Sequence, residues 1–103
     1  MKHVLLTAAI LALLGTTSAV QAAGDAAAGG AKANVCAGCH GAKGEGKDPN
    51  PALAGKAEDV IVQALKDYKS GKRKNGIMKT FASPLSDQDM ANLAAYYASL
   101  KGK

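Results

Sequence analysis

Two segments of the chain carry hydrophobic residues at the spacing of an α-helix. One apolar face recurs every three or four residues between positions 57 and 70, and another does so between positions 86 and 100. The first face consists of Ile61, Ala64, Leu65 and Tyr68. The second consists of Met90, Leu93, Ala94, Tyr97 and Leu100. Both segments are therefore predicted to be amphipathic helices that bury one face.

The ends of these two helices carry the residues that helix ends favour. Glu58 and Asp59 occupy the first turn of the earlier helix, where negative charge suits the helix dipole, and Gly71 is a suitable C-cap. Ser86 is the expected N-cap of the later helix, and Asp89 stands three residues on, at the second position of a capping box. Start and stop signals therefore agree with the hydrophobic period.

Residues 24–38 predict a third helix of a different character. Asp25 is a suitable N-cap, and most of the residues after it are alanine or glycine. Gly29 and Gly30 lower the stability of an isolated helix, so their presence favours close packing against another helix over a generic alanine helix.

Glycine and proline mark two loops between the predicted helices. Residues 41–55 contain four glycines and two prolines, and residues 72–85 contain Gly76 and Pro84. Neither loop shows a helical period. The segment from residue 23 to residue 103 is thus predicted to be one all-α domain of three main helices and loops.

Residues 1–22 have the features of a secretory signal peptide. Lys2 gives a positive start, an apolar run covers residues 4–14, and small residues end the segment. The run is shorter than the roughly 20 apolar residues of a membrane span, which argues against an uncleaved anchor. We therefore expect cleavage after Ala22, or alternatively after Ala23, export to the periplasm, and no stable membrane insertion afterwards.

Length and charge restrict how the domain can be stabilised and which partners it can bind. The 103-residue chain has 13 basic and 8 acidic side chains and a formal net charge of +5. A domain this small usually needs a disulfide, a metal or a cofactor in addition to its core. The basic balance suits an acidic protein partner. The sequence lacks the clustered basic and aromatic residues of a nucleic-acid binder, so nucleic acid is not expected as a partner.

The candidate chemistry lies in Cys36-Ala37-Gly38-Cys39-His40, which has the spacing of a c-type haem attachment site. Residues three and four apart share one face of a helix, so Cys36, Cys39 and His40 can all face one porphyrin. Each thiol can form a thioether with a haem vinyl group, and the His40 imidazole can reach the iron as an axial ligand. A covalent haem would also supply the stabilisation that a small domain needs.

Other uses of the two cysteines fit less well. A thioredoxin-like pair is expected beside a βαβ pattern, which the flanking alanine and glycine do not provide. A structural zinc site needs four ligands, whereas the chain after residue 22 offers two cysteines and one histidine. A disulfide with two intervening residues closes a very small loop and gains little stability. We therefore predict one covalently bound haem c.

A six-coordinate iron needs a ligand opposite His40, and Met, Lys, Tyr and water are the candidates. Met90 falls at the fourth position of the last helix, where it can pair with Leu85 as a hydrophobic staple. Met78 lies in the predicted loop after Gly76, from which a thioether can reach the far face of the haem. The alternative for Met78 is a buried side chain that fills a gap. We predict Met78 as the second axial ligand.

At this point the sequence resembles the bacterial class I cytochromes c, in particular single-haem relatives of the dihaem periplasmic cytochromes. The resemblance covers nearly all of residues 23–103. The segments that carry the resemblance are Cys36-Ala37-Gly38-Cys39-His40-Gly41, Pro51-Ala52-Leu53-Ala54-Gly55, Asn75-Gly76-Ile77-Met78, and Leu85-Ser86-Asp87-Gln88-Asp89 leading into Leu93-Ala94-Ala95-Tyr96-Tyr97. One departure is Lys56, where relatives often have glutamine.

The resemblance implies a small cytochrome c fold wrapped around the haem. It implies thioethers at Cys36 and Cys39, with His40 and Met78 as iron ligands. It also implies that the Pro51 carbonyl accepts a hydrogen bond from His40 Nδ1–H, which would fix the imidazole ring.

A second implication of the resemblance concerns the helices. The first and last helices are expected to cross, with Gly29 and Gly30 against Tyr96 or Tyr97.

The function that follows is a diffusible periplasmic one-electron carrier and not an enzyme, because two good axial ligands leave no open position on the iron. A haem enzyme or gas sensor with an open iron site is one alternative, and an electron-transfer subunit of a larger oxidase or reductase is another. The expected partners are redox proteins that donate and accept electrons and present acidic surfaces. The basic residues that could steer them are Lys66, Lys69, Lys72, Arg73, Lys74 and Lys79, with an ordinary solvated surface as the alternative.

Overall fold

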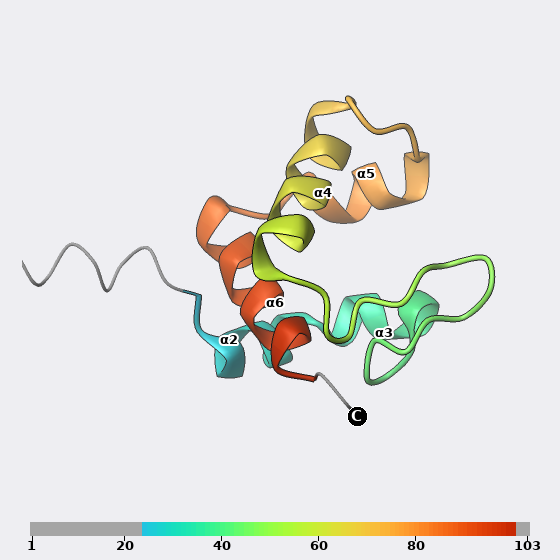
Figure 1. Cartoon of the computed structure of the whole chain (residues 1–103). Helices are drawn as coiled ribbons and strands as arrows, with labels where there is room; N and C mark the ends of the chain where they lie inside the picture. The colour runs from blue at the N-terminus through green and yellow to red at the C-terminus, as the bar shows by residue number, and fades with distance from the viewer. Residues whose placement is uncertain (1–23, 101–103) are drawn as a thin grey trace, which may run out of the picture.

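The computed structural model describes residues 24–100, and the regular elements of this part of the chain are all helices. They follow in the order α2 (Ala26–Lys32), α3 (Asn34–His40), α4 (Glu58–Ser70), α5 (Gly76–Ala82) and α6 (Asp87–Ser99) (Figure 1). The expected all-α architecture is confirmed. Among the described helices, none is both long and apolar enough to cross a membrane. The predicted signal peptide and its cleavage positions lie outside the described residues.

Helices α4 and α6 begin and end where the sequence signals place them. The C-cap of α4 is Gly71, whose φ of 86° lies in the left-handed region that glycine adopts most easily. In α6 the Ser86 hydroxyl accepts a hydrogen bond from the Asp89 N–H, and the Asp89 carboxylate accepts one from the Ser86 N–H. This is a complete capping box, so the last helix starts at a defined residue.

The helix predicted over residues 24–38 is divided into two. Ala33 separates α2 from α3 and keeps right-handed helical angles, with φ −69° and ψ −10°. The Cys36 N–H bonds to the Ala33 carbonyl oxygen at 2.8 Å, which is the tighter i to i+3 pattern of a 3₁₀ turn. The break is therefore a local tightening of a helical chain, and α3 then runs on to His40.

The loop predicted over residues 72–85 contains a helix, so that prediction was wrong for its central part. Asn75 is the N-cap of α5, with extended backbone angles and a side chain that accepts a hydrogen bond from the Met78 N–H at 3.0 Å. A capped helix of seven residues is too short to show a hydrophobic period. The consequence is that Met78 lies in the first turn of a helix and not in a loop.

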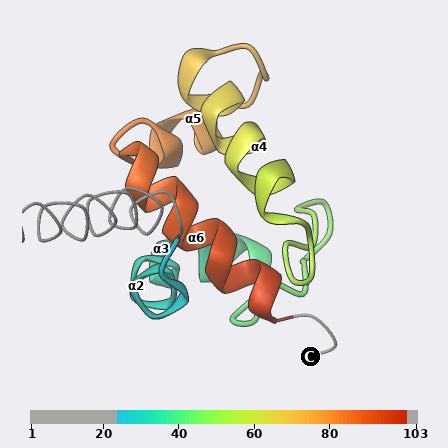
Figure 2. The ribbon, with the colours of Figure 1, turned by 60° about the vertical axis from the view of Figure 1, so that its left-hand side comes forward.

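Helix α6 lies between α2 and α4 and supplies most of the core. Figures 1 and 2 show it crossing the middle of the molecule, with α2 on one side and α4 on the other. The buried hydrophobic cluster consists of Ala33, Ile61, Leu85, Met90, Leu93, Ala94 and Tyr97. Only Ile61 of the predicted apolar face of α4 is buried, whereas Ala64, Leu65 and Tyr68 are partly exposed. That helix therefore has an apolar face that the polypeptide does not cover.

The expected crossing of the first and last helices is confirmed. A Cβ built on Gly29 would overlap the Asn92 carbonyl oxygen, and one built on Gly30 would lie 3.1 Å from the ring of Tyr96. The Asp25 N–H also donates a hydrogen bond to the Asn92 side chain at 2.7 Å. Glycine at position 29 is therefore required by the approach of two backbones.

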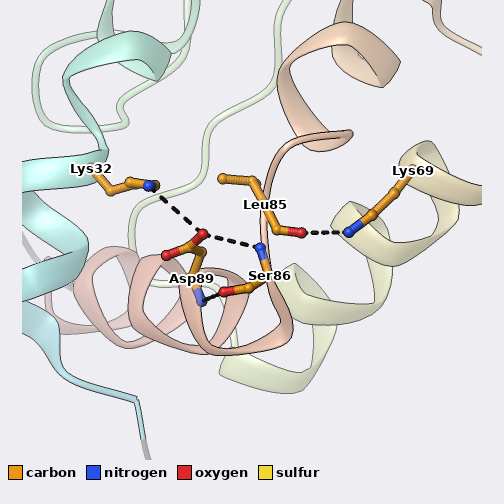
Figure 3. Close-up of polar contacts among 5 residues, drawn as sticks. All are labelled: Lys32, Lys69, Leu85, Ser86 and Asp89. Carbon is orange, nitrogen blue, oxygen red and sulfur yellow. Dashed lines mark hydrogen bonds and ion pairs between the residues drawn. The ribbon is translucent and has the colours of Figure 1, made fainter.

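Polar contacts join the start of α6 to its neighbours (Figure 3). Lys32 of α2 lies 3.7 Å from the Asp89 carboxylate, which ties the capping box to the first helix. Lys69 of α4 donates a hydrogen bond to the Leu85 carbonyl oxygen at 2.5 Å. The junction between α5 and α6 is thus held from both sides.

Candidate functional site

The three motif residues lie on the last two turns of α3. Cys36, Cys39 and His40 are three and four residues apart, so they share one side of the helix. His40 is 6% exposed and is the buried polar side chain of the described part of the chain. Cys36 is partly buried, while Cys39 is exposed and thus accessible to a reacting group.

The ring of His40 is held in one orientation. Its Nδ1 lies 2.8 Å from the Pro51 carbonyl oxygen, so the hydrogen bond that the resemblance implied is present. A carbonyl oxygen can only accept, which places the ring proton on Nδ1 and leaves the lone pair of Nε2 available. This is the tautomer that a histidine needs in order to bind a metal through Nε2.

The loop after α3 is shaped so that Pro51 returns to His40. Gly41, Gly44 and Gly46 all have positive φ, and the Gly46 N–H bonds to the His40 carbonyl oxygen at 2.7 Å. The Asn50 side chain donates to the Cys39 carbonyl oxygen at 3.1 Å, beside Pro51. These bonds use the free carbonyl groups at the end of α3 and fix the loop against the motif.

A cavity of about 470 Å³ opens between α3, α4, α5 and α6. Most of its lining is apolar, and it includes the uncovered face of α4. The lining residues are Cys36, His40, Pro49, Asn50, Pro51, Leu53, Lys56, Val60, Ile61, Ala64, Leu65, Tyr68, Arg73, Asn75, Met78, Leu93 and Tyr97. A space of this size and polarity is typical of a small-molecule or cofactor site.

Met78 and Met90 have different surroundings. Met78 lines the large cavity and also a second cavity of about 120 Å³, in both cases together with Cys36 and His40. Met90 is 1% exposed and lines neither cavity. It belongs to the core with Leu85, as expected for a hydrophobic staple.

Burial alters the acidity of two groups on the cavity wall. It raises the pKa of the Cys36 thiol, an effect that the nearby Tyr97 hydroxyl partly offsets. Burial also raises the pKa of Tyr97, and the proximity of Cys36 acts in the same direction. Both groups are therefore neutral at physiological pH in the polypeptide.

Two cationic side chains, Lys56 and Arg73, line the mostly apolar cavity. Lys56 precedes α4 and Arg73 follows it, so they come from opposite ends of that helix. The Arg73 guanidinium lies 5.0 Å from the centre of the Tyr68 ring, a cation–π contact that orients it. Sequence reasoning assigned Lys56 no role, and it missed Asn75 and Asn50, whose capping and loop contacts become visible only in the fold.

Comparison with known proteins identifies the family of this chain. The cytochrome c family profile matches residues 26–101. The chain belongs to the cytochrome c family. It is 50% identical over 97 residues to cytochrome c4 of Pseudomonas aeruginosa, which covers 93% of this chain and 48% of that protein. It is 44% identical over 81 residues to cytochrome c-554(548) of Halomonas halodenitrificans, which covers 75% of this chain and 98% of that protein.

Structural comparison agrees with the sequence comparison. The crystal structure of reduced recombinant cytochrome c4 from Pseudomonas stutzeri superimposes with a TM-score of 0.72 at 42% identity, over 79% of this chain and 48% of that one. The chain spans about half the length of the cytochrome c4 relatives that it matches. The cytochrome c fold and the relation to the c4 proteins are thereby confirmed.

Cytochromes c carry haem c, which is bound covalently through a Cys-x-x-Cys-His motif. The residues of this structure fit that cofactor. The cavity has apolar walls for the porphyrin, and its histidine is held as the Nδ1–H tautomer. The cofactor also explains why one face of α4 is left uncovered by protein.

Proposed function

We propose that this chain is a periplasmic one-electron carrier in which Cys36 and Cys39 hold haem c through thioethers and His40 and Met78 are the axial ligands. The observation that carries the proposal is that His40 and Met78 line the same two cavities, whereas Met90 is packed in the core. Membership of the cytochrome c family supports the electron-carrier function.

The residues around the site suit a carrier. Haem supplies the one-electron redox chemistry when it is bound. Pro51 keeps His40 in the tautomer and orientation for metal binding, and the Asn75 cap fixes the backbone of Met78. A thioether ligand favours the reduced state relative to harder ligands and so raises the potential. The apolar wall of the cavity limits the access of water.

Location and partners belong to the same proposal. Export through the segment 1–22 would place the protein in the periplasm, where thiols are not kept reduced as they are in the cytoplasm. A relative in Thiomonas intermedia, 36% identical over 103 residues, is named a thiosulfate dehydrogenase electron acceptor. We infer that this chain likewise exchanges electrons with redox proteins, and that these have acidic docking surfaces.

Not all of the basic residues near Met78 are free to meet such a partner. Lys69 donates to the Leu85 carbonyl oxygen, and the Arg73 guanidinium stacks on Tyr68. All six basic residues are exposed, but among the described residues Lys66, Lys72, Lys74 and Lys79 have no such contact. We therefore propose that docking relies mainly on these four lysines, while Lys69 also stabilises the junction of α5 and α6.

The ligand assignment is tested by two methionine variants of the matured protein. Met78→Ala should abolish the sulfur-to-iron charge-transfer band of the oxidised state, lower the reduction potential and admit cyanide or azide to the iron. Met90→Leu should keep the band and cost under about 1.5 kcal/mol of stability, because the exchange nearly conserves volume.

The reverse pattern, with the band lost only in Met90→Leu, would overturn the assignment. A wild-type protein that lacks the band and binds cyanide readily would instead indicate an open-site haem enzyme or gas sensor.

A further inference from the structure

Tyr97 of α6 is almost completely buried, with 2% of its surface exposed, although it carries a polar hydroxyl group. A buried hydroxyl lowers stability unless it forms a hydrogen bond. The Tyr97 hydroxyl donates one to the sulfur of Cys36, the first cysteine of the haem motif. A phenylalanine would fill the same space without the cost of burying a hydroxyl. The polar group of Tyr97 is therefore directed at a residue of the cofactor site.

The ring of Tyr97 supports the loop that follows α3. The backbone of Gly44 lies so close to it that a Cβ built on Gly44 would be 2.7 Å from the Cδ1 and Cε1 atoms of the ring. The Gly44 carbonyl oxygen in turn accepts hydrogen bonds from the Leu53 and Ala54 N–H groups, at 2.8 and 2.9 Å. The beginning and the end of the loop are thus joined to each other beside the Tyr97 ring.

The backbone of Tyr97 contacts the same loop. Its carbonyl oxygen accepts a hydrogen bond from the Gly55 N–H at 2.9 Å. Pro51 lies between Gly44 and Gly55 in this loop. The Pro51 carbonyl oxygen is the partner of His40 Nδ1, at 2.8 Å. The ring and the backbone of Tyr97 therefore both hold the segment that orients His40.

The neighbouring Tyr96 faces a different element. Its ring meets that of Tyr97 edge to face, with the centroids 5.1 Å apart, and it packs on Gly30 of α2. Tyr96 is not part of the lining of either cavity described above. It belongs to the crossing of α2 and α6, so the two adjacent tyrosines have separate roles.

We propose that Tyr97 is a positioning residue for the haem iron, because its hydroxyl holds Cys36 while its ring and carbonyl oxygen hold the loop that orients His40. This inference rests on the electron-carrier function proposed above. After thioether formation the sulfur of Cys36 can only accept a hydrogen bond, so the hydroxyl is its donor. A donor at this point draws electron density from the haem and favours the reduced state. The ring limits opening of the loop and so keeps the imidazole in one orientation.

The test follows the exchange of the His40 Nδ1–H proton with deuterium by NMR of the reduced, haem-loaded protein. This proton is protected while Pro51 is in place, so its exchange reports opening of the loop. Tyr97→Leu removes the ring and should speed the exchange on the order of tenfold, the effect of one lost hydrogen bond. Tyr97→Phe keeps the ring and should exchange like wild type. Tyr96→Leu is the matched control, since it loosens the helix crossing and should leave the exchange unchanged.

Voltammetry of Tyr97→Phe measures the effect of the hydroxyl. Loss of the donor should shift the reduction potential to a lower value, whereas Tyr96→Phe should keep the wild-type potential. Gly44→Ala approaches the same contact from the loop, because its methyl group would press on the intact Tyr97 ring. It should also speed the exchange of the His40 proton, and it serves as the test if Tyr97→Leu does not fold.

Several outcomes would overturn the proposal. Exchange at the wild-type rate in Tyr97→Leu and Gly44→Ala would show that Tyr97 does not hold the loop. Equal acceleration in Tyr96→Leu would trace the effect to a general loss of stability. An unchanged potential in Tyr97→Phe would remove the role of the hydroxyl.

Carbon monoxide tests the carrier function separately. The reduced wild type should not bind it, because Met78 already occupies the iron, and ready binding would overturn the proposed ligand set. The exchange of the His40 proton would then still decide the role of Tyr97, since the carbon monoxide complex of reduced haem is diamagnetic too.

Discussion

Hydrogen bonds from neighbouring loop residues hold the two proposed iron ligands. The Pro51 carbonyl oxygen fixes the His40 ring, and the Asn75 side chain caps the backbone N–H of Met78. Each contact comes from outside the short helix that carries the ligand. The positions of His40 and Met78 therefore depend on neighbouring loops, and small changes in those loops should register at the redox centre.

Replacement of Asn75 tests this dependence. Asn75→Ala removes the acceptor for the Met78 N–H and should lower the free energy of unfolding by about 1 kcal/mol, the usual cost of a lost N-cap. It should also make the charge-transfer band disappear at lower urea concentration than the helical signal does, since α5 would open first. Asn75→Asp keeps an acceptor and serves as the control. Identical urea midpoints for all three proteins would contradict a capping role.

At the scale of elements, the sequence predicts the long helices and misses the short one. Helices α4 and α6 have thirteen residues each, long enough to show a period and both ends. Helix α5 has seven residues, and its one local signal is Asn75 ahead of it. The turn at Ala33 has no adjacent glycine or proline that would predict it; Ala33 is buried, which is a tertiary feature that the local sequence does not show.

The site, too, has features that the local sequence predicts and features that depend on the fold. The spacing of Cys36, Cys39 and His40 is local, so the motif could be read directly from the sequence. The contact of Pro51 with His40 came only from the family resemblance, because it joins residues across a glycine-rich loop. The cavity, and the presence of Lys56 and Arg73 on its wall, depend on how four helices pack. No local pattern encodes such packing.

The crossing of α2 and α6 predicts opposite effects for two glycines. Gly29→Ala would force a methyl group into the Asn92 backbone and should destabilise the protein by about 1–3 kcal/mol. Gly38→Ala has open space around its Cβ and should stabilise α3, by up to about 1 kcal/mol. Thermal unfolding of the two haem-loaded variants measures both. Equal effects would mean that helix propensity, and not the close approach, sets the role of Gly29.

The capping box of α6 should make stability depend on pH. Hydrogen bonds from the Ser86 backbone, and then the hydroxyl of that residue and Lys32, lower the pKa of Asp89 below its ordinary value of 3.8. A lowered pKa gives stability that is present above the unfolded value and is lost as pH falls through the folded one. Asp89→Asn should therefore be less stable than wild type at pH 7, and the difference should shrink below about pH 4.

The pH dependence is measured by urea unfolding across that range. Asp87→Asn removes a carboxylate from the same turn outside the capping box, and it is the matched control. A gap between wild type and Asp89→Asn that stays constant down to pH 2 would rule out the carboxylate as its source.

On the scale of the whole molecule, the net charge of +5, or +4 once Lys2 is removed with residues 1–22, should govern encounters with partners. Surface charges are screened beyond about 8–10 Å at ordinary ionic strength, so electrostatic steering weakens as salt is added. The second-order rate of reduction by an acidic redox protein should therefore fall as salt rises, and less steeply in Lys74→Gln. Stopped-flow kinetics measures this slope. A rate that is indifferent to salt would leave the lysines as ordinary solvated surface.

The hydrogen bond between Asp25 and Asn92 joins residues 67 positions apart, and it encloses the whole functional segment between the two crossing helices. The loop over residues 41–57 is largely exposed and is the kind of segment that proteases cut. A single cut there would divide the chain, but α2 would stay attached to α6 through their packed backbones. A thioether on Cys36 and a ligand from Met78 would then join the two fragments through the haem itself. The two fragments of the cut chain should therefore remain associated as one folded unit.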